Sequence, residues 1–214
     1  NMAPAMKWWL EEYARQIEYA AQNARPSVYS TEKEAVAGRE AIEPMLKTRW
    51  DQIEPYNDQC PLSGAMRTYT GCVATAMAQV MKYWEYPARG KGSISYTTAT
   101  LNKRLSLNFA TKAFDWDAMK DTYRNGSYTD AEADAVAYLM KACGYAVKMN
   151  YSTEASGALA MNVGKGMVKY FDYDPNTEYT LRLYYSSTQW DELLYNNLRN
   201  VGPIIYGGAS RLGG

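Results

Sequence analysis

Histidine is absent from all 214 residues of this chain. The absence removes the imidazole that usually serves as the general base for a cysteine nucleophile, and it removes the commonest ligand of zinc. The three cysteines, Cys60, Cys72 and Cys143, are too widely spaced to match the usual metal-binding patterns. The sequence therefore predicts no metal site.

The chain also lacks net charge and long apolar runs. It has 23 basic and 23 acidic residues and no long basic stretch, which argues against nucleic acid or an anionic membrane as a partner. No apolar stretch approaches the roughly 20 residues of a membrane span. Residues 1–4 lack the pattern of a signal peptide, as expected if the chain begins inside a longer precursor. A neutral or peptide-like ligand fits this composition better.

An odd number of cysteines leaves at least one thiol unpaired in an oxidising compartment. A disulfide between Cys60 and Cys143 and a pair of free thiols are both compatible with the sequence, and we expect free thiols. Apolar residues make up 47% of the chain, and it has 20 Tyr and 6 Trp. The chain can therefore bury a sizeable core as one domain, or as one domain with a short appendage.

Hydrophobic periodicity divides the chain into elements. Apolar side chains at helical spacing predict helices over 4–23, 73–84, 130–143, 162–170 and 188–199, with Gly144 ending the third and Ser187 or Thr188 capping the last. Residues 24–39 lose this pattern and read as an exposed linker. Alternating or apolar patterns predict strand and loop over 42–57, strands within 91–109, a short strand with a Ser/Gly loop in 145–161, and strands at 178–185 and 202–208. Such an order predicts an α+β fold.

Gly71 and Cys72 are the most informative pair, because a polar loop turns there into a helical run. The first backbone N–H groups of a helix have no internal partner, and the helix dipole adds partial positive charge, so a thiolate is favoured at Cys72. An inert buried thiol is the structural alternative, since free cysteine is among the most buried residue types. Position alone leaves both interpretations open.

Residues 69–84 resemble the active-site helix of the streptopain-like cysteine peptidases, bacterial enzymes with a papain-like fold. The resemblance covers about residues 42–214, and residues 4–10 are similar to the end of the family's propeptide. Further matching segments are Trp50-Asp51-Gln52, Pro55-Tyr56-Asn57, Phe114-Asp115-Trp116, Ala142-Cys143-Gly144, Met149-Asn150-Tyr151 and 202–206. The resemblance implies an α+β papain-like fold with a helical lobe and an antiparallel β-lobe, incomplete at the C-terminus.

The resemblance also implies a site, residue by residue. Cys72 matches the nucleophile, and Gln52 matches the glutamine whose amide helps to form the oxyanion hole. The Ser156-Gly157-Ala158 loop falls where the family lines its substrate cleft. Gly213 and Gly214 match the glycines that precede the catalytic histidine, so the expected histidine comes directly after Gly214, itself a substrate-binding position.

By the same resemblance, the protein is a secreted, periplasmic or cell-surface bacterial cysteine endopeptidase that needs no metal or organic cofactor. Residues 1–40 would be the C-terminal helix and linker of a propeptide, and residues 41–214 the N-terminal portion of the peptidase domain. Its partners would be protein or peptide substrates, its own propeptide and the missing C-terminal β-lobe. Specificity would depend on a hydrophobic residue two positions before the scissile bond. Without a histidine, this fragment alone is expected to be inactive.

A different class of protein remains as the alternative, namely an inactive papain-fold module that binds or inhibits a partner peptidase. The absence of histidine supports it. The combination of the Cys72 helix with Gln52 argues against it, because a binding module has no chemical reason to keep both. A histidine directly after Gly214 would exclude this alternative.

Overall fold

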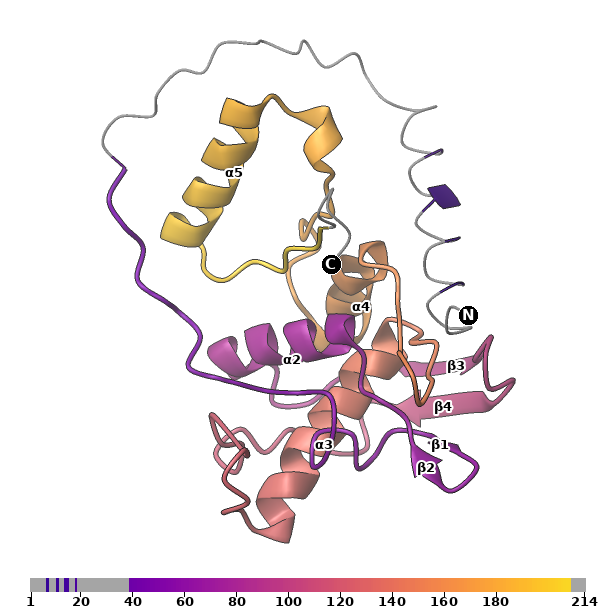
Figure 1. The fold of residues 1–214 in the computed structure, drawn as a ribbon. Helices are drawn as coiled ribbons and strands as arrows, with labels where there is room; N and C mark the ends of the chain where they lie inside the picture. The colour runs from indigo at the N-terminus through magenta and orange to yellow at the C-terminus, as the bar shows by residue number, and fades with distance from the viewer. Residues whose placement is uncertain (1–6, 8–10, 12–13, 16–17, 19–38, 209–214) are drawn as a thin grey trace.

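The computed structural model describes residues 7, 11, 14, 15, 18 and 39–208 (Figure 1). The described residues before position 39 are helical and exposed, in agreement with the predicted N-terminal helix. The rest of that helix, the linker up to residue 38, and Gly213 and Gly214 lie outside the described residues. Residues 39–186 form the body of the molecule, and residues 187–208 follow it.

Helix α3, Asp130–Ala146, is the central element of this body (Figure 1). It begins after Thr129, whose side chain accepts a hydrogen bond from the Glu132 N–H while the Glu132 carboxylate accepts one from the Thr129 N–H. This reciprocal capping satisfies two backbone donors at the start of the helix. Most of α3 is buried, because α2 (Cys72–Trp84) and α4 (Met161–Phe171) both pack against it.

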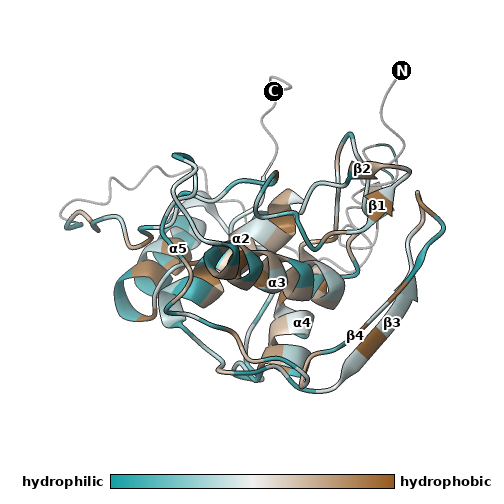
Figure 2. Cartoon of the chain, turned by 90° about the horizontal axis from the view of Figure 1, so that it is seen from below, coloured by the Kyte–Doolittle hydropathy of each residue, from teal (hydrophilic) through white to brown (hydrophobic). Residues whose placement is uncertain are grey.

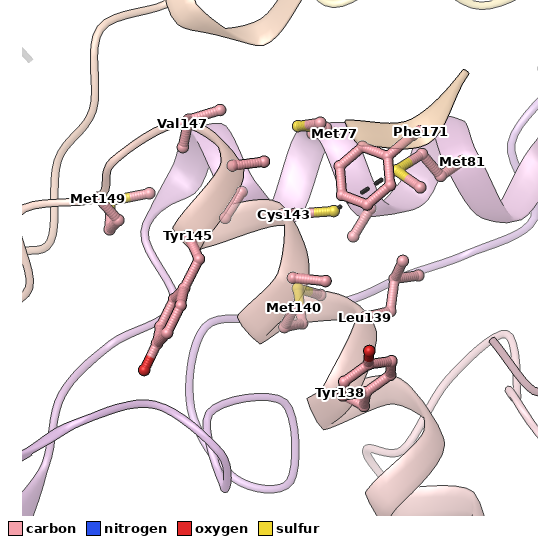
Figure 3. Packing of buried hydrophobic residues seen from close by; sticks show 14 of the residues in the cluster. Met77, Met81, Tyr138, Leu139, Met140, Cys143, Tyr145, Val147, Met149 and Phe171 are labelled. Atoms are coloured by element: carbon pink, nitrogen blue, oxygen red, sulfur yellow. Dashed lines mark hydrogen bonds between the residues drawn. The ribbon is translucent and has the colours of Figure 1, made fainter. Parts of the chain in front are cut away.

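Sulfur-bearing and aromatic side chains fill the space between α2 and α3 (Figure 3). Met81 of α2 lies beside Cys143 of α3 and the ring of Phe171 at the end of α4, and Met77 and Met140 belong to the same buried cluster. The Cys143 Sγ lies 3.6 Å from the Met81 Sδ. Methionine adapts well to irregular gaps between helices. Apolar packing therefore fixes α2 on α3.

Two antiparallel hairpins complete the body. In the larger hairpin Ile94 pairs with Leu107 and Tyr96 with Leu105, so these four side chains share one face of the sheet. That face is turned to the core, since Ile94 and Leu105 are buried, and Figure 2 shows the hairpin along one side of the helices. The paired strands are β1 (Leu62–Ser63) with β2 (Met66–Arg67), and β3 (Ser93–Thr97) with β4 (Arg104–Asn108).

Several predicted strands are wrong. Residues 178–185 are irregular and contain the 3₁₀ turn η1 (Arg182–Tyr184), and residues 202–208 have no regular secondary structure. Residues 42–57 contain turns rather than a strand, and 145–161 contributes only the bridge between Asn150 and Gly157. A strand needs a neighbour for its backbone groups, and among the described residues the four strands β1–β4 pair only with one another. The composition of these segments indicates strand propensity, but it does not show whether a neighbouring strand is present to pair with them.

Two predicted helix boundaries are also wrong. Helix α3 continues through Gly144 to Ala146, and helix α5 (Ser187–Asn200) is capped by Ser186 rather than by Ser187 or Thr188. The Ser186 hydroxyl accepts a hydrogen bond from the Gln189 N–H. Gly144 does not end its helix because its lack of a side chain serves tertiary packing. A Cβ at this position would overlap the hydroxyl of the buried Tyr151.

This close approach predicts that a side chain at position 144 destabilises the protein and that a second substitution at position 151 restores most of the stability. The variant Gly144→Ala is expected to lower the free energy of unfolding by about 3 kcal/mol, near the upper end for an overpacked core. The Tyr151 hydroxyl, which no hydrogen bond reaches among the described residues, is the group in the way. Tyr151→Phe removes it but keeps the ring carbon Cζ, 3.1 Å from the added Cβ, so the double variant should recover most of the lost stability, helped by the higher helix propensity of alanine.

Urea unfolding followed by tryptophan fluorescence checks the prediction. Tyr151→Phe alone is the control and should be close to wild type, because it removes a buried hydroxyl that lacks a partner. The Tyr151 hydroxyl interacts with the Cys60 thiol, but the geometry of this contact does not meet the criteria for a hydrogen bond. A double variant as unstable as Gly144→Ala would contradict the packing described.

Helix α5 stands apart from the other helices (Figure 1). Within it only Trp190 is buried. The Arg199 guanidinium lies 3.3 Å from the Glu40 carboxylate, and the Tyr195 hydroxyl donates to the Glu40 carbonyl at 3.2 Å. On leaving the helix, the backbone at Gly202 packs against the ring of Trp84 in α2. Surface contacts and a short connection thus hold α5 to the body.

Candidate active site

Cys72 is the first residue of α2, and its side chain is exposed. The preceding residue, Gly71, has φ 87° and ψ 136°, a conformation that residues with a side chain rarely adopt. A Cβ there would lie 2.6 Å from the Met149 side chain and 3.1 Å from the Ser156 carbonyl oxygen. Glycine is therefore needed so that the chain can turn into the helix with Cys72 at its N-terminus.

Threonine hydroxyls lock the first turn of α2. The Thr75 N–H and the Thr75 Oγ1 both donate to the Gly71 carbonyl, at 3.1 and 3.2 Å. The hydroxyls of Thr70 and Thr75 are 2.9 Å apart, and both side chains are buried. The turn that presents Cys72 is thus held from the loop side and from the helix side.

Gln52 is brought to the same loop. The Thr70 N–H donates to the Gln52 carbonyl at 3.2 Å, and Thr70 is separated from Cys72 only by Gly71. The Gln52 N–H in turn donates to the Asp51 carboxylate at 2.7 Å. The Gln52 side chain is half-buried. Two residues that are distant in sequence therefore lie on adjoining segments at the start of α2.

The 152–157 loop lies on another side of this turn. The Tyr69 N–H donates to the Ser152 carbonyl at 3.1 Å. Gly157 and Asn150 exchange backbone hydrogen bonds of 3.1 and 2.9 Å, and the Ser156 hydroxyl donates to the Ser152 carbonyl at 3.2 Å. Ser156, Gly157 and Ala158 are all buried. Their role in substrate binding stays a prediction, and Gly214 lies outside the described residues.

The three thiols differ sharply in environment, and none forms a disulfide. Burial raises the pKa of Cys60 to about 12 despite the nearby charge of Arg67. Complete burial raises the pKa of Cys143 as well. Both groups are therefore protonated and covered at neutral pH, which confirms the expectation of two free thiols. Cys72 is the exposed thiol.

Sequence reasoning missed several residues that build this site. Thr75 follows Gly71 by about one helical turn, a spacing at which a threonine hydroxyl often bonds back to a carbonyl, so a local signal was present. Met149 and Gln79 act through contacts distant in sequence, for which the sequence carries no local signal. Among the residues that the structure describes, no three side chains of the metal-binding types come together. Nor is any helix in the described ranges long and apolar enough to cross a bilayer.

Comparisons with known proteins place this geometry in context. Residues 50–214 match the sequence model of the peptidase C10 family. The thiol protease/hemagglutinin PrtT of Porphyromonas gingivalis is 26% identical over 98% of this chain and 25% of its own length. Streptopain of Streptococcus pyogenes is 30% identical over 77% of this chain and 45% of its own length. The chain thus spans less than half the length of these curated relatives.

Two solved structures are similar in fold. Active interpain A, a cysteine protease of Prevotella intermedia, superposes with a TM-score of 0.70 and 41% identity over 77% of this chain and 68% of its own. A prointerpain A fragment from the same organism, with a cysteine-to-alanine mutation, superposes with a TM-score of 0.72 and 36% identity over 96% of this chain and 66% of its own. The proform therefore matches more of this chain than the active protease does.

Proposed function

Because the chain belongs to the peptidase C10 family, we propose that it is the nucleophile-bearing part of a cysteine endopeptidase whose thiolate is Cys72. Family membership confirms the resemblance to streptopain-like peptidases, and the likeness to interpain A confirms the α+β papain-like fold. The observation that carries the proposal is the exposed thiol at the first residue of a well-anchored helix. The Gln52 segment adjoins it.

The proposed reaction is acyl transfer from a peptide to sulfur and then to water. The Cys72 thiolate forms a bond to the peptide carbonyl carbon, and the carbonyl π electrons move to oxygen. The Gln52 amide and the Cys72 N–H donate hydrogen bonds to this oxyanion, and each such donor typically lowers the barrier by about 3 kcal/mol. The C–N bond then breaks, the amine leaves with a proton, and water hydrolyses the thioester.

The proton transfers need a base, which we place on a histidine directly after Gly214. The match of Gly213 and Gly214 to the glycines that precede the family's histidine supports this position. Imidazole takes the thiol proton and later gives it to the leaving amine. We call the longer protein that would carry this histidine the parent protein, and the proposed reaction is ascribed to it.

A propeptide is the second part of the proposal. Residues 1–40 would form its C-terminal helix and linker, and residues 41–214 the N-terminal portion of the peptidase domain. The proform of interpain A matches 96% of this chain and the active form 77%, which supports an N-terminal segment of propeptide type. The parent would be an enzyme of the cell surface, periplasm or exterior, acting on proteins with an apolar residue two positions before the scissile bond.

Thiol labelling tests the proposed nucleophile. In the parent protein at about neutral pH, a peptidyl alkylating probe is expected to modify Cys72 and to leave Cys60 and Cys143 unmodified, as read by peptide mass spectrometry. Burial holds the pKa of Cys60 at about 12 against a usual value of 9.0, so this thiol is protonated at neutral pH.

The Cys60 thiol ionises at a lower pH in the unfolded chain than in the folded protein. Its contribution to the free energy of unfolding therefore declines as the pH rises from about 9 to about 12.

Unfolding in urea provides the control, because it should expose all three cysteines to the same reagent. A probe that labels the three thiols equally slowly in the folded protein would contradict the proposal. That result would favour the inactive binding module.

A further inference from the structure

The side chain of Gln79 joins helix α2 to the segment that leads to Gln52. Its Oε1 accepts a hydrogen bond from the Thr48 Oγ1 at 3.0 Å and another from the backbone N–H of Trp50 at 3.4 Å. A backbone N–H is only a donor, so the atom that faces it is the amide oxygen, whose two lone pairs suit the two bonds. Gln79 is half-buried beside a shallow hollow between α2 and residues 45–48.

Gln79 and Cys72 belong to one rigid element. Gln79 follows Cys72 by about two helical turns and so lies near the same face of α2. Packing against α3 fixes this helix in the core. The bond from Gln79 to Trp50 therefore ties the segment that carries Gln52 to the helix that carries the thiol.

The remaining contacts leave this segment little freedom. The Trp50 indole N–H donates to the Lys120 carbonyl at 2.8 Å, and the Arg49 N–H donates to the Asp121 carbonyl at 2.7 Å. At the other end, the Gln52 carbonyl accepts from the N–H of Thr70. Trp50 and Gln52 are separated by one residue, which spans at most about 7 Å. The position of Trp50 thus limits where Gln52 can lie.

We infer that Gln79 is a positioning residue, which helps to set the place of Gln52 relative to Cys72 by holding the backbone of Trp50. The inference rests on the proposed function, in which Gln52 donates to the oxyanion. A displacement of about 1 Å in a catalytic group can cost up to about 10²-fold in rate. Gln79 itself contacts the protein rather than the substrate, so its loss affects kcat rather than KM.

Variants of Gln79 in the parent protein, assayed on a peptide substrate, test the inference. Gln79→Met keeps the length of the side chain but removes the acceptor, and it should lower kcat about tenfold with KM changed less than about twofold. Gln79→Lys, which opposes the Trp50 N–H with another donor, is a second variant with the same expected loss. Gln79→Glu keeps an acceptor oxygen and should retain kcat within about threefold.

A double variant separates positioning from a general structural role. In a Gln52→Ala background, Gln79→Met should lower kcat no further, because the group it positions is already missing. Gln59→Met is the matched control and should keep wild-type kcat, since the Gln59 side chain donates to exposed Asp134. Thermal unfolding of each variant shows that it is folded at the assay temperature.

Distinct outcomes would overturn the inference or its premise. Equal losses from Gln79→Met in the wild-type and Gln52→Ala backgrounds, or wild-type kcat in both Gln79→Met and Gln79→Lys, would overturn the inference alone. Wild-type kcat in Gln52→Ala would overturn the proposed role of Gln52 and the inference with it.

Discussion

Cys72→Ala is expected to abolish peptide hydrolysis by the parent protein, with a loss in kcat/KM of at least about 10³-fold. The substitution removes the atom that forms the thioester, and binding with oxyanion stabilisation leaves only a small residual rate. Because the Cys72 side chain is exposed, the free energy of unfolding should change by less than about 0.5 kcal/mol. Hydrolysis of a fluorogenic peptide, together with urea unfolding, measures both quantities.

Cys60→Ala is the matched control for this variant. It removes a thiol that is buried and protonated, so we expect activity within about twofold of wild type at a modest cost in stability of about 1 kcal/mol. The opposite pattern, with activity retained in Cys72→Ala and lost in Cys60→Ala, would place the nucleophile elsewhere. Loss of folding in Cys72→Ala would show instead that the N-terminal turn of α2 needs the sulfur.

Gln52→Ala should lower kcat about 10²-fold to 10³-fold, the usual effect of removing one oxyanion donor. KM should change little, because the hydrogen bond forms mainly with the charged oxygen of the transition state. Steady-state kinetics of the parent protein on a peptide substrate separate the two constants. Gln52→Glu should be at least as impaired, since a carboxylate offers no donor and repels the oxyanion.

The matched control for Gln52 is Gln59→Ala. Gln59 belongs to the same turn-rich segment but donates to Asp134 in α3, so its loss should leave kcat unchanged. A loss in Gln52→Ala that appears only in KM would assign Gln52 to substrate binding rather than to the oxyanion hole.

Local patterns were enough to predict the elements around the nucleophile. The apolar spacing after Cys72 predicts a helix that the structure places at Cys72–Trp84, and the alternation within 91–109 corresponds to β3 and β4. The sequence pattern agrees with the structure in these elements because each of them buries one face, which sets the spacing of its apolar residues. By contrast, the strand predicted at 202–208 depends on a neighbouring strand, which propensity alone does not supply.

The residues of the candidate site also divide into those that a sequence motif identifies and those that only long-range contacts reveal. Cys72 and Gln52 are identified by their resemblance to a family motif, and the structure brings their segments together through the Thr70 N–H. Gly144 was misread as a helix end because its partner, Tyr151, follows after the helix and meets it only in the folded protein. The sequence does not identify Gln79 as a residue of the site, because a glutamine within a helix does not indicate which backbone group it will contact. Long-range contacts, rather than local propensity, decide such positions.

The weak attachment of α5 implies that the protein does not open as a single cooperative unit. Its amide hydrogens should exchange with solvent through local opening, because little apolar surface is uncovered when this helix separates from the body. The amides of α3 lie in the packed interior and should exchange only when the whole body unfolds. We therefore expect a slow-exchanging core, which carries Cys72, and a fast-exchanging helix that leads into residues 202–208.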